Sequence, residues 1–216
     1  MFEIINTVSE NDIEQDFIAI GGYYDNSEKK IYHSVIIIQF RKKVYAFHYT
    51  GLDDRPIVFD ENIDEDCFHK ITTAVPSILV PSFLKQCEKI FERAAPVYGY
   101  FYSGEFYDID GNHNSDTHTG ETMTCAGFCL NILKGFLMTE YVDYTQWDSA
   151  SHEVSGYLEY FSNKHSLDID LIAQSHRRIS PLDLLCSGYF NDLPIQKKQI
   201  DSKKQEVFDY LQGFYS

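Results

Sequence analysis

The chain is organised around the stretch Gly120-Glu121-Thr122-Met123-Thr124-Cys125-Ala126-Gly127-Phe128-Cys129-Leu130-Asn131-Ile132-Leu133-Lys134-Gly135. Its apolar residues recur at the i, i+3, i+4 spacing of a helix with one buried face: Cys125, Phe128, Cys129, Ile132, Leu133 and Phe136. Thr122 or Thr124 can cap the start of this helix. We therefore predict a core-facing helix that begins at a cysteine.

Cys125 falls in the first turn of that helix. The free backbone N–H groups and the positive end of the helix dipole favour a thiolate there, which makes Cys125 a candidate nucleophile. The alternative is that Cys125 is a structural cysteine on an apolar helix face, the commoner role of a buried cysteine. Cys129, one turn further on, is expected to serve packing.

Two strands are predicted upstream of the helix. Residues 34–40 are β-branched and almost wholly apolar, as in a strand that is buried on both faces. Residues 41–43 are basic and predict a turn, and residues 44–50 then read as a returning strand.

Two histidines flank this hairpin. His33 precedes the first strand and His48 lies near the end of the second, so an antiparallel pairing brings both to the same end of the sheet. The register stays open, because a turn centred on Lys42 places His33 opposite Gly51.

The rest of the chain adds further elements without a repeat or a linker, which predicts a single domain over residues 1–216 with residues 188–216 as a C-terminal helical extension. Ser180-Pro181-Leu182-Asp183-Leu184-Leu185 has the pattern of a capped helical turn. The other expected elements are a strand at 17–20, a loop with a short helix within 52–75, a strand at 97–102, and helices at 81–93, 154–161 and 203–215.

Composition restricts the possible partners. The formal net charge of −15 argues against binding nucleic acid or an anionic membrane surface, whereas a basic partner would be attracted. Met1-Phe2-Glu3-Ile4-Ile5-Asn6 lacks the pattern of a secretory signal, so we expect none, and we expect no stable membrane insertion because no segment approaches the length of a membrane span. Five unevenly spaced cysteines without a C-x2-C pair favour a reducing, cytoplasmic setting and no structural zinc; we expect no cofactor.

Several kinds of catalytic or binding site lack support in the sequence. The loop that starts at Asp108 resembles a calcium loop, but His113 and Thr119 occupy the positions where an EF-hand needs Gly and Glu. His113 and His118 are left as weak candidates for a metal site. The chain has no G-x-S-x-G serine motif and no phosphate-binding glycine loop.

Cysteine and histidine remain as the best candidates for chemistry. A thiol nucleophile needs a base, a third group that orients the base, and N–H donors for an oxyanion, which the start of the Cys125 helix supplies. His33 and His48 can provide the first two if the hairpin meets the helix. Each histidine alone would otherwise be an ordinary strand-edge or packed strand residue.

The order of these parts resembles the circularly permuted NlpC/P60 group of papain-like proteins, which includes lecithin:retinol acyltransferase-like and YiiX-like enzymes. The matching stretches are 33–38, 44–48, 124–129 and 178–184. The resemblance implies an α+β fold in which an antiparallel sheet packs against the cysteine helix, with additional helices. It further implies Cys125 as nucleophile, His33 as base and His48 as the orienting residue; Asp53 or Asp54 is the alternative to His48.

The function that follows as an expectation is that of a soluble cysteine hydrolase or acyltransferase. It would act on an amide, ester or thioester of a peptide-like or acyl substrate through an acyl-cysteine intermediate. Aromatic residues would line its groove: Tyr100, Tyr102 and Phe106. The main alternative is a non-catalytic acidic protein of the inhibitor or immunity type that binds a basic protein partner; a metal-dependent hydrolase using His113 and His118 is the third.

Overall fold

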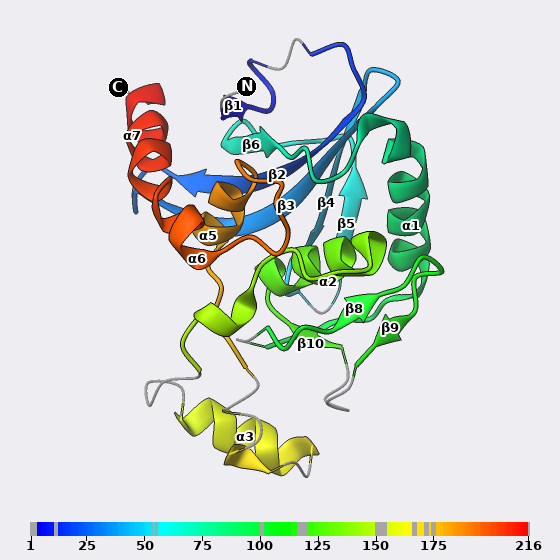
Figure 1. Ribbon diagram of the computed structural model, residues 1–216, viewed down its shortest axis with the longest axis vertical. Helices are drawn as coiled ribbons and strands as arrows, with labels where there is room; N and C mark the ends of the chain where they lie inside the picture. Colours follow the sequence, from blue (N-terminus) through cyan, green and yellow to red (C-terminus); the bar gives the residue numbers. More distant parts are fainter. Residues whose placement is uncertain are drawn as a thin grey trace.

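The computed structural model describes residues 4–10, 13–52, 54, 56–99, 102–115, 121–149, 155–165, 168–170, 173 and 176–215. At its centre is a six-stranded antiparallel sheet with the strand order β1-β6-β2-β3-β4-β5 (Figure 1). Its strands are β1 (Ile5–Asn6), β2 (Phe17–Asp25), β3 (Lys30–Phe40), β4 (Lys43–Tyr49), β5 (Ile57–Asp60) and β6 (Cys67–Ile71). The predicted α+β class is confirmed, whereas the loop and short helix predicted within 52–75 are wrong, because β5 and β6 lie there.

The predicted hairpin is present as β3 and β4. Phe40 pairs with Lys43, so the turn holds only Arg41 and Lys42. Both have positive φ, 52° and 68°, as in the two-residue turns whose twist suits a hairpin. The register pairs Ile36 with Phe47, which excludes the pairing of His33 with Gly51.

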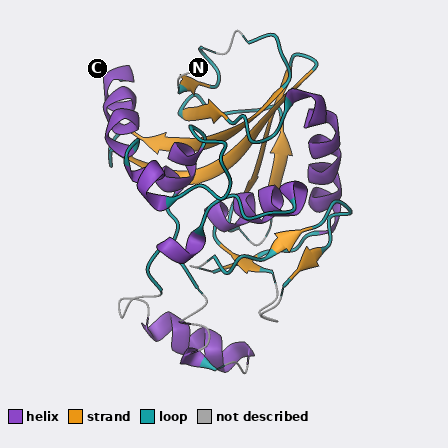
Figure 2. Cartoon of the chain, viewed as in Figure 1, coloured by secondary structure: helices purple, strands orange, loops and turns teal. Residues whose placement is uncertain are grey.

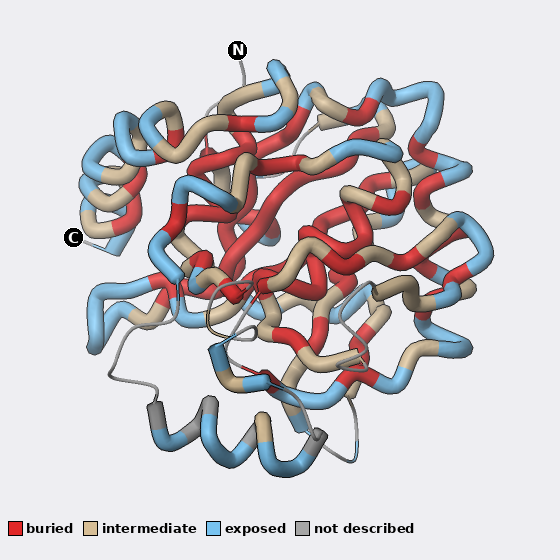
Figure 3. The backbone as a smooth tube through the Cα atoms, turned by 60° about the horizontal axis from the view of Figure 1, so that its bottom comes forward, coloured by how far each residue is buried: buried red, intermediate tan, exposed pale blue. Residues whose placement is uncertain are grey.

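Side chains of the sheet alternate between two apolar clusters. Ile36 and Ile38 of β3 belong with Phe47 of β4 to the main core, whereas Val35 and Ile37 belong to a smaller cluster on the opposite face. Most residues of the central strands are buried, and the exposed residues gather in loops and on the outer sides of the helices (Figure 3). The central strands thus have two apolar faces, as predicted for residues 34–40.

Helices cover the face of the main core (Figure 2). The helices of this layer are α1 (Val80–Arg93), α2 (Cys125–Leu137), α5 (Pro181–Ser187), α6 (Lys197–Asp201) and α7 (Lys204–Phe214). Each of the predicted helices at 81–93 and 203–215 agrees with its observed helix to within one residue at either end. None of the described helices combines the length and the apolar character that crossing a bilayer requires.

Smaller elements lie around this centre. Two short pairs flank α2: β7 (Val97–Tyr98) with β10 (Thr122–Met123), and β8 (Phe106–Tyr107) with β9 (His113–Asn114). The single-turn helices η1 (Ser77–Leu79) and η2 (Tyr144–Gln146) precede α1 and follow α2. Helix α3 (Ser155–His165) lies away from the sheet, at the bottom of Figure 1.

The predicted cap at Ser180 is present and joins three parts of the chain. The Ser180 hydroxyl accepts from the Asp183 amide (3.1 Å), and the Asp183 carboxylate accepts from the Ser180 amide (2.9 Å), a reciprocal capping box. Asp183 also forms an ion pair with Lys204 of α7 (2.6 Å) and accepts from the indole of Trp147 (3.3 Å). The side chain of Asp183 therefore joins the start of α5 to α7 and to Trp147.

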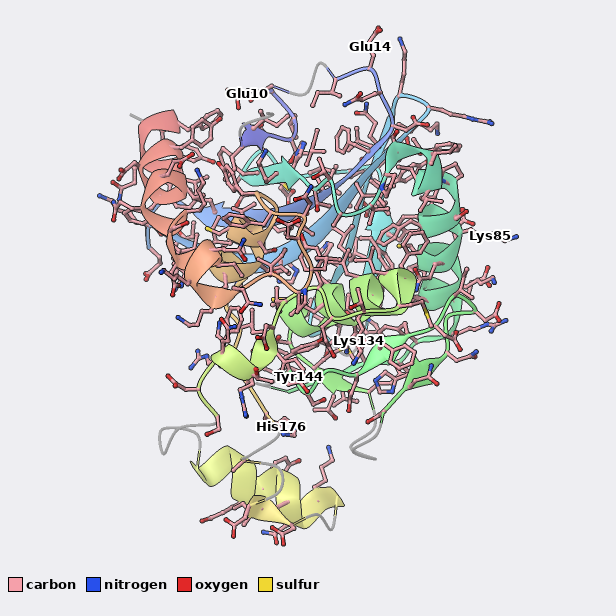
Figure 4. The ribbon with its side chains drawn as sticks, in the orientation of Figure 1. Glu10, Glu14, Lys85, Lys134, Tyr144 and His176 are labelled. Atoms are coloured by element: carbon pink, nitrogen blue, oxygen red, sulfur yellow. The ribbon has the colours of Figure 1, made fainter. Side chains whose placement is uncertain are left out.

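The two ends of the chain are also joined to the sheet. Glu10, labelled in Figure 4, accepts from the Asn6 amide (2.7 Å) and from the Tyr210 hydroxyl of α7 (2.6 Å). Helices α6 and α7 contribute apolar side chains to the main core: Ile200, Val207 and Leu211.

The N-terminal segment crosses the second face of the sheet. Gln39 of β3 donates to the carbonyl oxygens of Ile13 and Gln15, the latter at 2.9 Å, and Ile13 packs on the smaller cluster. Lys42 pairs with Glu14 (3.3 Å; Glu14 is labelled in Figure 4). This segment covers the end of β3 near Gln39. The other end of β3, at His33, has other neighbours, which are described with the candidate site.

Helix α2 packs very closely on the β8–β9 pair at Gly135. A Cβ at this position would lie 1.6 Å from the backbone oxygen of Tyr107, a contact that only displacement of α2 or β8 can relieve. We expect Gly135→Ala to lower the free energy of unfolding by about 3 kcal/mol or more, measured by urea denaturation. Gly213→Ala in α7 is the control, because its added Cβ has no neighbour within 4 Å apart from the adjacent residues and the backbone of its own helix; equal stability of the two variants would contradict the close approach.

Candidate functional site

Cys125 is the first residue of α2. Thr124 is the N-cap, and its hydroxyl accepts from the Gly127 amide at 3.0 Å, so one of the two predicted caps is used. All five cysteines are described and reduced, and Cys125 is the one that is not fully buried. Cys129 is completely buried in the main core. The helix thus begins where the sequence predicted, with the thiol in its first turn.

The Cys125 thiol faces the helix-covered side of the sheet, next to Ser34 of β3. Burial raises the pKa of this thiol, and the backbone and hydroxyl of Ser34 lower it by a smaller amount. The helix dipole favours a thiolate at this position, but desolvation outweighs the dipole because burial penalises the charged form. Cys125 is therefore mainly a protonated thiol at neutral pH.

The two histidines are in contact with each other. His33 Nε2 and His48 Nδ1 are 2.7 Å apart, and the rings stand nearly perpendicular, at 78°. Both rings lie against Tyr23 of β2, with centroid distances of 5.8 Å and 5.7 Å. Tyr23 belongs to the smaller cluster, on the face that the helices do not cover. The prediction that the hairpin brings both histidines to one end of the sheet is confirmed.

The structure does not bring these histidines to Cys125. Neighbouring residues of a strand point to opposite faces, so His33 shares the face of Val35, and Ser34 shares the face of Ile36. The thiol therefore meets a serine where the resemblance implied a histidine. Of the alternatives for the third residue, Asp54 is exposed and Asp53 lies outside the described residues.

A pocket of about 440 Å³ opens beside the histidine pair. Its walls combine the two imidazoles with Tyr23 and Tyr32, and two carboxylates border it. Asp60 comes from the end of β5, and Asp64 comes from the loop that leads to β6.

The field in and around this pocket is negative. Burial, together with the nearby charges of Asp66, Asp64 and Asp25, raises the pKa of Tyr32 to about 12. Burial also raises the pKa of Asp66, with Asp64 and Asp25 adding to the effect, while its hydrogen bond with Tyr32 opposes it. A cation entering this region would be stabilised.

His33 adds no positive charge to this field at neutral pH. Burial lowers the pKa of its imidazole to about 4, because the protonated ring would lose its hydration. The pair is held together by one ring N–H that donates to the nitrogen of the other ring.

Other residues predicted for the groove or for a metal lie elsewhere. Tyr102 is buried and donates to Glu140 (3.1 Å), and Phe106 lies under the ammonium of Lys134, which is labelled in Figure 4. His113 contacts the buried Glu105 at 3.0 Å. Tyr100 and His118 lie outside the described residues. Within the described part of the chain, no group of three or more His, Cys, Asp or Glu residues has a metal-binding arrangement.

Comparison with known proteins gives no match: no family model, no curated protein and no solved structure is significantly similar to this chain. Sequence reasoning missed the aromatic and acidic residues that line the pocket beside the histidines: Tyr23, Tyr32, Asp60 and Asp64. The acidic run Asp60-Glu61-Asn62-Ile63-Asp64-Glu65-Asp66 was the available signal, but its position beside the histidines depends on the pairing of β4 with β5.

The thiol environment predicts slow alkylation. At pH 7.5 we expect iodoacetamide to modify Cys125 more slowly than it modifies a cysteine in an unstructured peptide, followed by mass spectrometry. His33→Ala should leave the rate unchanged, and Ser34→Ala should lower it, because Ser34 favours the thiolate. A rate above that of the free thiol, lost in His33→Ala, would instead support a Cys–His catalytic pair.

The neutral His33 predicts a loss of stability in acid. An unfolded histidine titrates near pH 6.5, whereas His33 in the fold titrates at about 4. Between these values the unfolded chain binds the proton and the folded chain does not, so the free energy of unfolding falls as the pH falls. We expect His33→Gln to reduce this slope by up to about 1.4 kcal/mol per pH unit, measured by urea denaturation from pH 7 to 4.5; an unchanged slope would contradict a His33 that stays neutral in the fold.

Proposed function

We propose that this chain is a non-catalytic acidic interaction protein, built on a permuted papain-like arrangement, whose partner presents a basic surface. One observation carries the proposal. The histidines implied as base and orienting residue form the wall of an acidic pocket, on the face of the sheet opposite the thiol.

The environment of Cys125 supports the absence of thiol catalysis. A cysteine nucleophile needs a base within hydrogen-bond reach, and the residue beside this thiol is Ser34, whose hydroxyl is a very weak base. Burial raises the pKa of the thiol, which disfavours the thiolate that would attack a carbonyl carbon.

The charge around the pocket supports a basic partner. Asp25, Asp64 and Asp66 all act on Tyr32, so three carboxylates converge on one exposed ring. Among the described residues, no Lys or Arg forms an ion pair with Asp64 or Asp66. A basic surface would relieve this mutual repulsion and would also be attracted by the net charge of −15.

A labelled octa-arginine peptide tests the proposal. We expect binding at 50 mM NaCl that weakens about tenfold or more at 300 mM, because salt screens exposed charges, and no binding of octa-glutamate. Backbone amide shifts in the NMR spectrum should cluster around Asp25, Asp60, Asp64 and Asp66. Cys125→Ser should bind equally well.

Two results would contradict the proposal. One is the absence of octa-arginine binding at 50 mM NaCl. The other is a set of shifts spread over acidic residues of all faces, including Glu92 on the outer side of α1.

A further inference from the structure

We infer that the pocket beside the His33–His48 pair is a subsite for one guanidinium group, an arginine side chain presented by the basic partner. This inference rests on the proposed function and names the group that its acidic face receives. Four kinds of feature support it: the aromatic walls, the carboxylates, the histidine pair and the size of the pocket.

The walls are planar rings grouped around Tyr23. The centroid of Tyr23 lies 6.3 Å from that of Tyr32, 5.8 Å from that of His33 and 5.7 Å from that of His48. A cation over the face of a tyrosine is attracted by the ring quadrupole, and a planar guanidinium can also stack on it. Tyr32 lines the pocket and is about half exposed, so a side chain that enters from solvent can reach its ring.

The carboxylates supply the fixed negative charge. The Asp60 carboxylate accepts from the Asn62 amide at 3.0 Å, which fixes its orientation at the end of β5. Asp64 lines the same pocket from the loop beyond Asn62. A guanidinium offers five N–H donors in a planar fork, so it can donate hydrogen bonds to two carboxylates at once. A compact ammonium is less suited to this arrangement.

The histidine pair leaves the pocket suited to a cation. His33 Nε2 and His48 Nδ1 lie 2.7 Å apart, so the N–H of one ring donates to the lone pair of the other. Two protonated imidazoles at this distance would each point an N–H at the other and would repel. The contact therefore allows at most one positive charge on the pair, and burial lowers the pKa of His33 to about 4, so His33 adds no competing charge at neutral pH.

Size and apolar lining favour a long side chain over a bare ion. A pocket of about 440 Å³ is much larger than one metal ion needs, and no metal-binding group of three ligands is present in the described residues. Val58 of β5 adds an apolar surface for the methylene groups that precede a guanidinium.

Calorimetric titration with acetylated hexa-arginine amide tests the inference, with hexa-lysine for comparison. We expect Asp60→Asn and Asp64→Asn each to weaken hexa-arginine binding about tenfold, the usual cost of losing a hydrogen bond to a charged group. The asparagine at position 60 retains an acceptor for the Asn62 amide. Glu92→Gln makes the same change of charge on an exposed residue of α1 and should change the affinity less than twofold.

The ring at position 32 is tested separately. Tyr32→Phe keeps an aromatic face and should bind within about threefold of the wild type, whereas Tyr32→Ala should lose about tenfold. Unchanged melting temperatures would show that these exposed substitutions leave the fold intact. Hexa-lysine should bind more weakly than hexa-arginine, and the difference should shrink in Tyr32→Ala.

The outcomes separate the two proposals. If hexa-arginine binds but Asp60→Asn, Asp64→Asn and Glu92→Gln each change the affinity less than twofold, the pocket is not the subsite, while the acidic interaction protein stands as long as the amide shifts still cluster around Asp25 and Asp66. If hexa-lysine binds as tightly as hexa-arginine, the guanidinium assignment is overturned. If neither peptide binds, the proposed function fails together with the inference.

Discussion

The alternation of side chains along β3 is the constraint on which the rest of the structure depends. In a strand, residue i and residue i+1 leave the sheet on opposite faces. Ile36 and Ile38 therefore anchor the helical layer, while Val35 and Ile37 form the smaller core behind it. Because of the same alternation, Ser34 lies beside the Cys125 thiol and His33 lies on the opposite face against Tyr23. A shift of one residue along β3 would exchange the two side chains, so this register decides whether a serine or a histidine lies beside the thiol.

The two faces of the sheet are covered in different ways, and this difference creates the pocket. Helices α1, α2, α5 and α7 cover the main core. The other face has a smaller cluster, on which Ile13 packs beside Gln39 and Ile63 packs from the loop between β5 and β6. At the His33 end no helix among the described elements fills the space, so the histidine pair and the acidic loop remain around an open pocket.

Local signals in the sequence predicted local structure well. The apolar run 34–40, the Thr124 cap and the Ser180 capping box each involve residues close together in the chain, and each is present. The placement of both histidines at one end of the sheet was predicted because a short hairpin joins them, whereas their contact depended on a register that stayed open. The face on which the histidines lie was not predicted, because it depends on the pairing of β3 with β2. The register of that pairing shifts between Tyr23 and Tyr24. The carboxylates of the pocket depend likewise on the pairing of β4 with β5.

The central position of residues 35–40 has a further consequence, for the fate of chains that have not finished folding. Val35-Ile36-Ile37-Ile38-Gln39-Phe40 has high β propensity and no charge or proline, the composition of segments that form intermolecular sheets. In the fold, β2 and β4 occupy both of its edges, and the outermost strands β1 and β5 are only two and four residues long. The native sheet thus conceals the segment most prone to aggregation. Conditions that slow the pairing of β3 with its neighbours expose that segment, and the mutual repulsion of highly acidic chains then becomes the main barrier to their association.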